Sequence, residues 1–577
     1  MVQPLKAYES LSNYYPFKRP YVIVSNDPQV GDFGPFTPGT QTAGIQEAIN
    51  YVQALGGGMV FIRKGTYNPQ AQILVLSGNI RILGEGRGVT VIQPAANISY
   101  QIPFNPLFVF GIDFNLNIHG NIRNVEVAHM TVYPSPIGST SSEVFIGFGG
   151  ILPSDSHFHD LQSEGTTGSD ILLEFGLDPT IGYVENVVIE NIWDHDSHPI
   201  DIQTAFPDVP NAQPSSSSTN NLRNLTIAHI YSTTDISLGD DKIAIFGSGA
   251  VGGNYIDSIT IEDIHILITP TGEGVNGIKL DIGTGCRFLN LAISKLWFMN
   301  YGTFLSNATF PLTLEGTGAT SSTVASVENV IVEKVYTYNA NTIQVFAPYQ
   351  LNGYVYPNPF CVYRDINIWE TQSTGYNGIL LFSPNNSPSG VLESLLLENV
   401  NINGWNNTGG ALAVMNIFNT SAVTWTGNII FKHVRAINMG SNGGDIPLAY
   451  IGNVSGAAVK GEDLVGVNYP FAAPSISPNP PGSGEVYQNG NNLDIELIIP
   501  VTLNPTSTAA ASAVLQIASG LTSTGTLNNP LTVDTETAPA GLASGFVKAL
   551  KARIPAGWYY ELTLTNAVAS TATVLPA

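Results

Sequence analysis

Three short segments concentrate ionisable side chains in a sequence where charges are rare. They are Asp194-His-Asp-Ser-His-Pro-Ile-Asp-Ile202, Gly239-Asp-Asp-Lys-Ile-Ala-Ile245 and Asn276-Gly-Ile-Lys-Leu-Asp-Ile282. Each contains an apolar-x-apolar pair, which is typical of a short strand whose side chains alternate between two faces. When these pairs are stacked in register, outward-facing Asp201, Ala244 and Lys279 form one column, and His198, Asp241 and Asn276 form the next.

This cluster suits acid–base chemistry on a glycosidic bond. Inverting glycosidases use one protonated and one ionised carboxyl group, roughly 6.5–9.5 Å apart. Carboxylates in successive coils can meet that spacing, and repulsion between like charges would raise the pKa of one of them. The candidate catalytic residues are Asp240, Asp241, Asp201 and His198. The candidate substrate-binding residues are Lys279, Asn276, Asp196 and Trp193. Alternatively, the cluster has only a structural role, in which Asp240 and Asp241 bind backbone N–H groups in a turn and Lys279 neutralises Asp201.

Other side chains offer weaker sites. In Asp155-Ser-His157-Phe-His159-Asp160 the two histidines are spaced to share one face of a strand and bind a metal ion, but the surrounding residues favour a loop. His195 and His198 are a second candidate pair, because both lie close to carboxylates in the sequence. The sequence therefore assigns no metal site and no cofactor. Several aromatic residues could stack on sugar rings, although packing along the chain explains most of them: Trp193, Tyr231, Trp297, Tyr301, Tyr338 and Tyr376.

A repeat positions these segments. The pattern apolar-x-apolar-x-x-apolar runs from Val125/Val127/Met130 to Ile429/Phe431/Val434, and a second apolar pair follows most copies by about a dozen residues. The intervening copies begin at Val187, Leu225, Ile259, Leu291, Val330, Ile366 and Leu395. Short strands that recur every 30 to 40 residues predict the coils of a parallel β-helix, more than propeller blades or tandem sandwiches.

The start of the repeat region carries a resemblance. Residues 39–92 contain Thr42-Ala-Gly-Ile-Gln-Glu-Ala-Ile49, then Gly56-Gly-Gly-Met-Val-Phe-Ile-Arg-Lys-Gly-Thr-Tyr67, then Leu83-Gly-Glu-Gly86. Ile45, Ala48, Ile49, Val52 and Leu55 form one helical stripe that can cover the end of a β-helix. This opening resembles the pectate-lyase-like superfamily, which implies an all-β fold: a single-stranded right-handed parallel β-helix with an N-terminal capping helix. Lyases, hydrolases, epimerases and phage tailspikes share that fold.

The segment Gly239-Asp-Asp-Lys-Ile-Ala-Ile245 is similar to the "G/Q-D-D-C-I-A-I" motif of the polygalacturonase family of inverting glycoside hydrolases. That resemblance implies that Asp240 and Asp241 are the general acid and base. Asp196-Ser-His-Pro-Ile-Asp-Ile202 aligns with the family's "N-T-D-G-I-D-I", with His198 where the family has a catalytic Asp. The family's "G-H-G" signature is absent, and Gly277-Ile-Lys-Leu falls one coil before the position of its "R-I-K".

The composition changes after about residue 465. We expect an N-terminal extension over 1–38, the parallel β-helix over 39–468, a proline-rich linker over 469–483 and a β-sandwich over 484–577. The last segment resembles modules of tail-fibre and other virion-associated proteins. Cys286 and Cys361 each open a coil, two coils apart, so we expect two free thiols rather than a disulfide.

Composition limits the partners. The 577 residues include 21 Lys and Arg against 44 Asp and Glu, which gives a formal net charge of −23. This balance argues against nucleic acid and against an anionic membrane surface. No apolar run is long enough for membrane insertion, and the first residues lack the apolar core of a signal peptide. Few basic residues also disfavour a polyanionic substrate, so a neutral glycan fits better.

These observations predict a protein that binds, and in one version cleaves, a polysaccharide or a glycosylated host surface structure. We expect a virion host-recognition protein, located on the virion surface or extracellularly. The alternatives are a secreted polygalacturonase-like hydrolase and a non-catalytic adhesin on the same fold, so whether the protein is an enzyme stays open. Analogy with tailspikes leaves a homotrimer open, although no coiled-coil heptad pattern supports one.

Overall fold

The computed structural model of the chain describes most of the 577 residues. The described residues are 20–95, 106–113, 118–120, 122–134, 146–165, 170–177, 183–203, 221–235, 241–247, 254–273, 275–282, 286–303, 309–316, 326–340, 344–348, 361–373, 380–382, 391–392, 395–407, 415–417, 423–425, 428–439, 449–451, 454–455, 458–465, 482–489, 495–522, 526–555 and 558–576. Within them the chain is almost entirely β-structure, with one helix.

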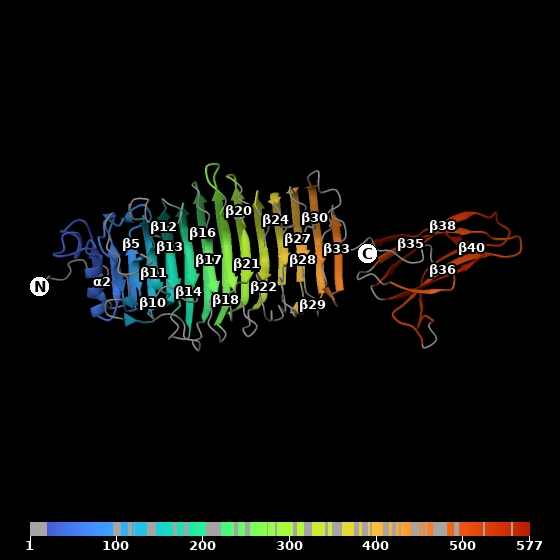
Figure 1. Cartoon of the computed structure of the whole chain (residues 1–577), viewed down its shortest axis with the longest axis horizontal. Coiled ribbons are helices and arrows are strands. Elements are labelled where there is room, and N and C mark those ends of the chain that lie inside the picture. Colours follow the sequence, from blue (N-terminus) through green and yellow to red (C-terminus); the bar gives the residue numbers. More distant parts are fainter. Residues whose placement is uncertain are drawn as a thin grey trace, which may run out of the picture.

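The main part is a stack of parallel strands in which successive coils lie side by side along the long axis (Figure 1). The largest described sheet has 16 strands and is parallel throughout. In spatial order its path is β1 (Tyr21–Val24), β2 (Gly58–Ile62), β5 (Ile80–Gly84), β10 (Arg123–Val132), β12 (Ser154–Glu164), β14 (Val184–His195), β16 (Leu222–Thr234), β18 (Asn254–Ile268), β20 (Cys286–Asn300), β22 (Ser326–Tyr338), β24 (Cys361–Ser373), β27 (Leu395–Asn407), β30 (Asn428–Met439) and β33 (Ala458–Val465). Two short strands, β3 (Gly65–Tyr67) and β6 (Thr90–Ile92), join it beside β10.

A second parallel sheet receives one strand from each of nine coils. It consists of β4 (Ile73–Val75), β7 (Pro106–Phe110), β11 (Ile146–Ile151), β13 (Ile171–Gly176), β15 (His198–Gln203), β17 (Asp241–Gly247), β19 (Asn276–Ile282), β21 (Leu312–Gly316) and β23 (Gln344–Pro348). The later coils form two three-stranded sheets, β25 (Leu380–Phe382) with β28 (Met415–Ile417) and β31 (Ala449–Ile451), and β26 (Val391–Leu392) with β29 (Val423–Trp425) and β32 (Val454–Ser455). Strands β8 (Ile112–Asp113) and β9 (Ile118–His119) form a small antiparallel pair. This arrangement confirms a large parallel sheet of the kind a β-helix requires.

The repeat pattern has a backbone cause. The two-residue gap before the last apolar position contains a residue with positive φ, such as His129, Asn191, His229, Asp263 or Lys295. A residue in this left-handed conformation bends the strand, so the alternation of side chains shifts by one and the next apolar residue again points inward. Asn and Asp tolerate this conformation better than other non-glycine residues, which explains their frequency at these bends.

The structure corrects the repeat at two coils. The pairing of β22 with β24 sets Val330 opposite Cys361 and Val335 opposite Ile366, so the β24 triplet begins at Cys361 and not at Ile366. The segment around His157 and His159 is not a loop, because it forms β12 within the main sheet. Both coils were misread because a less apolar residue, Ser156 or Cys361, holds the first position of the triplet.

One continuous hydrophobic core runs through the stack from Val22 to Val434. The helix α2 (Ile45–Ala54) packs at its start, with Ile45, Ala48, Ile49 and Val52 fully buried. The predicted helical stripe is therefore confirmed except for Leu55, which follows the helix and is 55% exposed. Strand β1 pairs with β2, so the parallel sheet already begins inside the segment 1–38 that was expected to be an extension.

The C-terminal strands form two four-stranded antiparallel sheets around a separate core, beyond β33 in Figure 1. One sheet contains β34 (Val486–Gln488), β39 (Tyr559–Thr565), β36 (Ala511–Ala518) and β37 (Leu531–Ala538). The other contains β38 (Phe546–Ile554), β35 (Ile495–Leu503), β40 (Ala567–Ala569) and β41 (Thr573–Pro576). The alternating burial of β35 and β36 shows one face of each strand turned to this core, as a sandwich requires.

The two cysteines do begin separate strands, β20 and β24, with β22 between them. Cys361 is in register with Val330, and Val330 with Leu291, so Cys286 lies five residues away from the column of Cys361.

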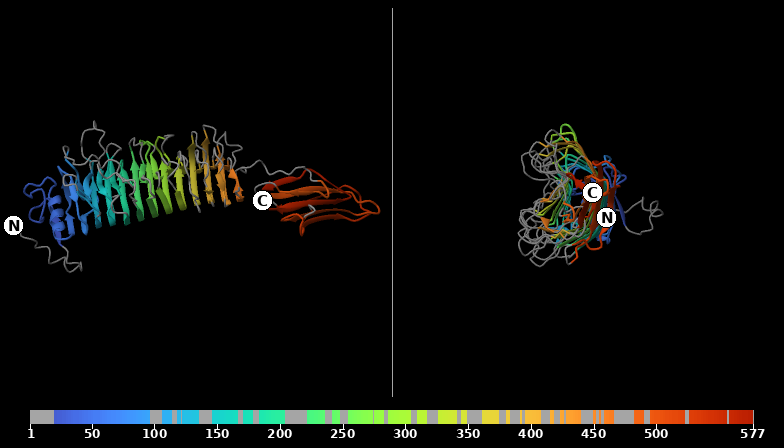
Figure 2. Two further views of the ribbon diagram at one scale, coloured as in Figure 1. Left: turned by 60° about the horizontal axis from the view of Figure 1, so that its bottom comes forward. Right: turned by 90° about the vertical axis from the view of Figure 1, so that its right-hand side faces the viewer.

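In the described part of the chain no helix is long and apolar enough to cross a bilayer. The view along the stack in Figure 2 shows the coils superimposed around a common axis.

Candidate functional site

The predicted columns of the smaller sheet are present. Asp201 pairs with Ala244, which pairs with Lys279, and Asp241 pairs with Asn276. The amide Nδ2 of Asn276 donates to Asp241 Oδ1 at 2.7 Å, and Lys279 Nζ lies 3.5 Å from Asp241 Oδ2. Strands β17 and β19 thus hold one carboxylate between a cation and an amide. Asp241 is only 5% exposed, so little of this carboxylate is open to a ligand.

Of the remaining predicted residues, His198 follows the same register, and the others lie elsewhere or outside the described residues. Asp240 lies outside the described residues. Asp196 occupies the turn between β14 and β15, where its Oδ1 accepts a hydrogen bond from the backbone N–H of Asp235 at 2.6 Å. His198 begins β15 two positions before Ile200, which pairs with Ile243, so the register sets His198 opposite Asp241, as predicted. Its side chain is 6% exposed, and its backbone N–H donates to the carbonyl of Asp170. Trp193 lies on β14, in the larger sheet.

The lysine beside Asp241 points into the core. Lys242 Nζ lies 3.1 Å from Asp194 Oδ2 and donates to the carbonyl of Ser197 at 2.6 Å. Asp194 also accepts hydrogen bonds from the hydroxyl groups of Ser163, Ser197 and Ser232. Part of the Asp-Asp-Lys motif therefore maintains a buried polar cluster, which a charged residue needs when it leaves water.

A column of stacked rings crosses the outer face of the larger sheet. Register places Trp193 opposite Tyr231, Tyr231 opposite His265, His265 opposite Trp297, and Trp297 opposite Tyr336. Centroids of successive rings are 5.0, 5.0, 6.0 and 4.1 Å apart, and the last three pairs are close to parallel. The guanidinium of Arg87 covers the Trp193 ring at 4.5 Å. We call these five residues the aromatic column.

A groove of about 500 Å³ runs beside the aromatic column. One wall is formed by column residues, and the other by the outward residues two positions further along each strand, namely His195, Thr233, Leu267 and Met299. Because the lining comes from five successive strands, β12 to β20, the groove extends along the stack and across the strands. Trp193, Trp297 and Leu267 are 47%, 37% and 39% exposed, so apolar surface gathers here.

A charged group lies at the edge of the groove. His195 Nδ1 is 3.0 Å from Glu164 Oε2, and Nε2 is 3.0 Å from Asp235 Oδ2 and 3.5 Å from Asp196 Oδ2. Burial acts to lower the pKa of His195, but hydrogen bonds to Asp235 and Glu164 outweigh it and raise that pKa. Hydrogen bonds from Thr269 and His195 lower the pKa of Asp235. The ligand atoms of His195, Asp196 and Asp235 lie within 4.8 Å of one another, close enough to share a cation.

Sequence reasoning named three members of the aromatic column and missed His265 and Tyr336. Trp193, Tyr231 and Trp297 were identified one at a time. The signal that aligns them is their equal separation, in sequence, from the apolar triplet of their own coil. Tyr301 and Tyr338 form a separate ring pair 5.2 Å apart, and Tyr376 lies outside the described residues.

No family model and no curated protein matches the sequence. Solved structures are similar in overall path. The A-module of the mannuronan C-5 epimerase AlgE6 of Azotobacter vinelandii is 13% identical, with a TM-score of 0.38 over 76% of this chain and 99% of that one. A tailspike protein of E. coli bacteriophage HK620, in complex with a pentasaccharide, is 10% identical, with a TM-score of 0.40 over 94% and 93%. The tailspike of Acinetobacter baumannii bacteriophage Fri1, a capsular polysaccharide depolymerase, is 11% identical, with a TM-score of 0.35 over 97% and 88%.

Proposed function

We propose that this protein binds an extended, uncharged glycan in the groove beside the aromatic column. The observation that carries the proposal is the groove itself, which exposes Trp193, Trp297 and Leu267 along the outer face of successive coils. Apolar and aromatic side chains with a few polar groups are the usual lining of a ligand-binding groove.

The lining matches the chemistry of a sugar. A pyranose presents apolar C–H groups and a rim of hydroxyls, and aromatic side chains with a polar atom can contact both. Beside the rings, Gln162, Thr233 and His195 offer hydrogen-bonding groups. The groove crosses the strands, so a linear chain could contact equivalent positions on one coil after another. The net charge of −23 disfavours a polyanion in the same place.

The wider setting is part of the proposal. We infer a single-stranded right-handed β-helix of the pectate-lyase-like kind, carrying the C-terminal antiparallel sheets as a tail-fibre-like module. In that setting the protein would recognise a host surface glycan from the virion surface or from outside the cell. A homotrimer would be compatible with this role, and gel filtration with light scattering would reveal it.

Hydrolysis is the second candidate function, supported by the group around Asp241. Register brings Asp241, Asn276, Lys279 and Asp201 into adjacent coils of one sheet, so two carboxylates and a lysine share one region. Catalysis there would need a substrate to reach a residue that is 5% exposed. The groove and this group lie on different sheets, so binding and hydrolysis can be tested separately.

The test combines a glycan array with an assay for released reducing ends, using neutral and acidic polysaccharides at several pH values. Glycan binding with no release, unchanged by Asp241→Asn, would support a recognition protein without catalysis. Release that disappears in Asp241→Asn while binding persists would support hydrolysis as well. The proposal fails if the folded wild-type protein binds no glycan of any class.

A further inference from the structure

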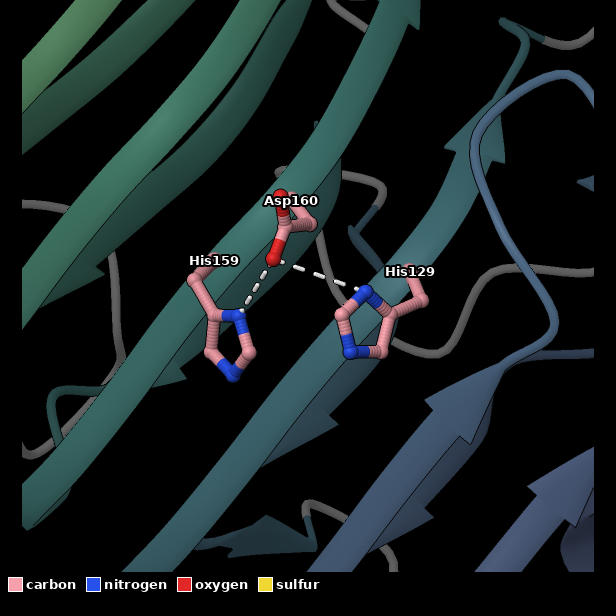
Figure 3. Close-up of side chains that lie close together, drawn as sticks. All are labelled: His129, His159 and Asp160. Atoms are coloured by element: carbon pink, nitrogen blue, oxygen red, sulfur yellow. Dashed lines mark hydrogen bonds and ion pairs between the residues drawn. The ribbon is translucent and has the colours of Figure 1, made fainter.

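Two histidines and one aspartate converge on the outer face of β10 and β12. Asp160 Oδ2 lies 2.8 Å from His159 Nδ1 and 3.5 Å from His129 Nδ1, and all three ligand atoms lie within 4.8 Å of one another. In Figure 3 the Asp160 carboxylate stands between the two rings, each with its Nδ1 turned toward it.

The bends of the coils bring these residues together. His129 and Asp160 both have positive φ, 62° and 50°, and both occupy the bend of their strand. The flanking pairs, Ala128 with His159 and Met130 with Leu161, show that the two bends are in register on adjacent coils. The cluster is therefore a consequence of the fold and not of one flexible side chain reaching across.

A second layer of contacts orients His159. Its Nε2 lies 3.3 Å from Glu126 Oε1, and Arg81 Nη2 donates to the same oxygen at 2.9 Å. A carboxylate on one ring nitrogen is the arrangement found behind histidines that bind a metal ion through the other nitrogen.

The spacing and the donor types select the ion. Around a tetrahedral ion with bonds of about 2.0–2.1 Å, ligand atoms lie roughly 3.3–3.4 Å apart, and the two measured distances to Asp160 fall on either side of that value. Two imidazoles and one carboxylate suit zinc and its neighbours, whereas calcium and magnesium prefer an all-oxygen set. The His129 side chain is 42% exposed, so solvent can reach the cluster.

We propose that His129, His159 and Asp160 bind one divalent transition-metal ion, with Zn²⁺ the best fit, and leave one coordination position open to water or a ligand hydroxyl. This proposal does not depend on glycan binding.

His157 provides the matched control. It lies on the same face of β12 as His159, with ring centroids 4.0 Å apart, but its Nε2 is 2.8 Å from Glu190 Oε1 on the next coil. It is therefore a neighbouring histidine outside the ligand set. His195, in the charged group at the groove edge, serves as a second control because it also lies beside carboxylates.

The experiment is calorimetric titration of Zn²⁺ into the metal-stripped full chain, with Co²⁺ absorption spectra to report tetrahedral coordination. His129→Asn and Asp160→Asn remove a ligand while keeping a residue that tolerates the bend, so both variants should fold, as circular dichroism would check. We expect one tight site in the wild type, in His157→Ala and in His195→Ala. We expect affinity to fall at least tenfold in His129→Asn and Asp160→Asn, and 10- to 100-fold in Glu126→Gln.

Two results would overturn the proposal. One is a wild-type protein that binds no Zn²⁺ or binds it equally well after His129→Asn and Asp160→Asn. The other is loss of the tight site in His195→Ala or His157→Ala with the His129→Asn protein unaffected, since this would assign the ion to other residues.

Discussion

Lys242 and Asp194 form an ion pair inside the stack, with Nζ 3.1 Å from Oδ2 and side chains that are 1% and 0% exposed. The pair connects β17 of the smaller sheet to β14 of the larger one. Burying two charges is costly, and their attraction together with the surrounding hydroxyl groups offsets that cost. Either charge alone would have no such compensation.

Lys242→Met should therefore destabilise the protein strongly, by about 3–5 kcal/mol, because it leaves a buried carboxylate without its cation. The double variant Asp194→Asn, Lys242→Met should regain most of that loss, since the Asn Oδ1 can accept a hydrogen bond from Ser163 while its Nδ2 can donate to the hydroxyl oxygen of Ser232. Thermal melts followed by circular dichroism would measure both. A double variant no more stable than Lys242→Met would contradict the pairing.

The charged group around His195 predicts a pH-dependent contribution to stability. The pKa of His195 is raised in the folded protein, so its contribution is complete below the unfolded pKa of about 6.5 and disappears as pH rises through the folded value. The pKa of Asp235 is lowered, so its contribution is present above about pH 3.9 and is lost as pH falls through the folded value. Both contributions are complete between these limits.

The measurement compares melting temperatures of the wild type and His195→Gln at pH 5.5 and pH 9. The wild type should exceed the variant by more at pH 5.5 than at pH 9, and an NMR titration of the His195 ring should have its midpoint above 6.5. An equal difference at both pH values, or a midpoint below 6.5, would show that the carboxylates do not stabilise the charged ring.

The bends predict the effect of substitutions at Lys295. This residue has φ of 56°, a conformation that costs a non-glycine side chain roughly 1–2 kcal/mol. Lys295→Gly should therefore leave stability unchanged or raise it by up to about 1 kcal/mol, while Lys295→Val should lower it by about 1–2 kcal/mol. Urea unfolding of the two variants would test this, and a Val variant as stable as the Gly variant would refute the left-handed bend.

The sequence predicts the coils because their inward positions are apolar and recur with the strand pattern. The columns Asp201–Ala244–Lys279 and Asp241–Asn276 follow from that register and are confirmed. The sequence did not indicate that Trp193 lies on the larger sheet and Asp196 in the turn between β14 and β15, and their role in binding substrate stays a prediction.

The groove could not be predicted from composition or from any single coil. Its aromatic wall depends on register across five strands, and its depth depends on how Leu267 and Met299 stand beside the rings. The sequence also does not predict that the Lys242 side chain points inward, because a lysine among alternating apolar residues is expected to face solvent. Only its contact with Asp194 explains the exception.

The central claim is that the groove beside the aromatic column holds a glycan, and calorimetric affinity for the best glycan from the array tests it most directly. Trp297→Ala removes a ring that lines the groove, whereas Tyr336→Leu removes the adjacent ring of the column, which lies beyond the groove lining. Trp297→Ala should weaken binding about tenfold or more, or about 1.4 kcal/mol, and Tyr336→Leu by less than about threefold. Equal affinity of wild type and Trp297→Ala, with both proteins folded, would contradict the account.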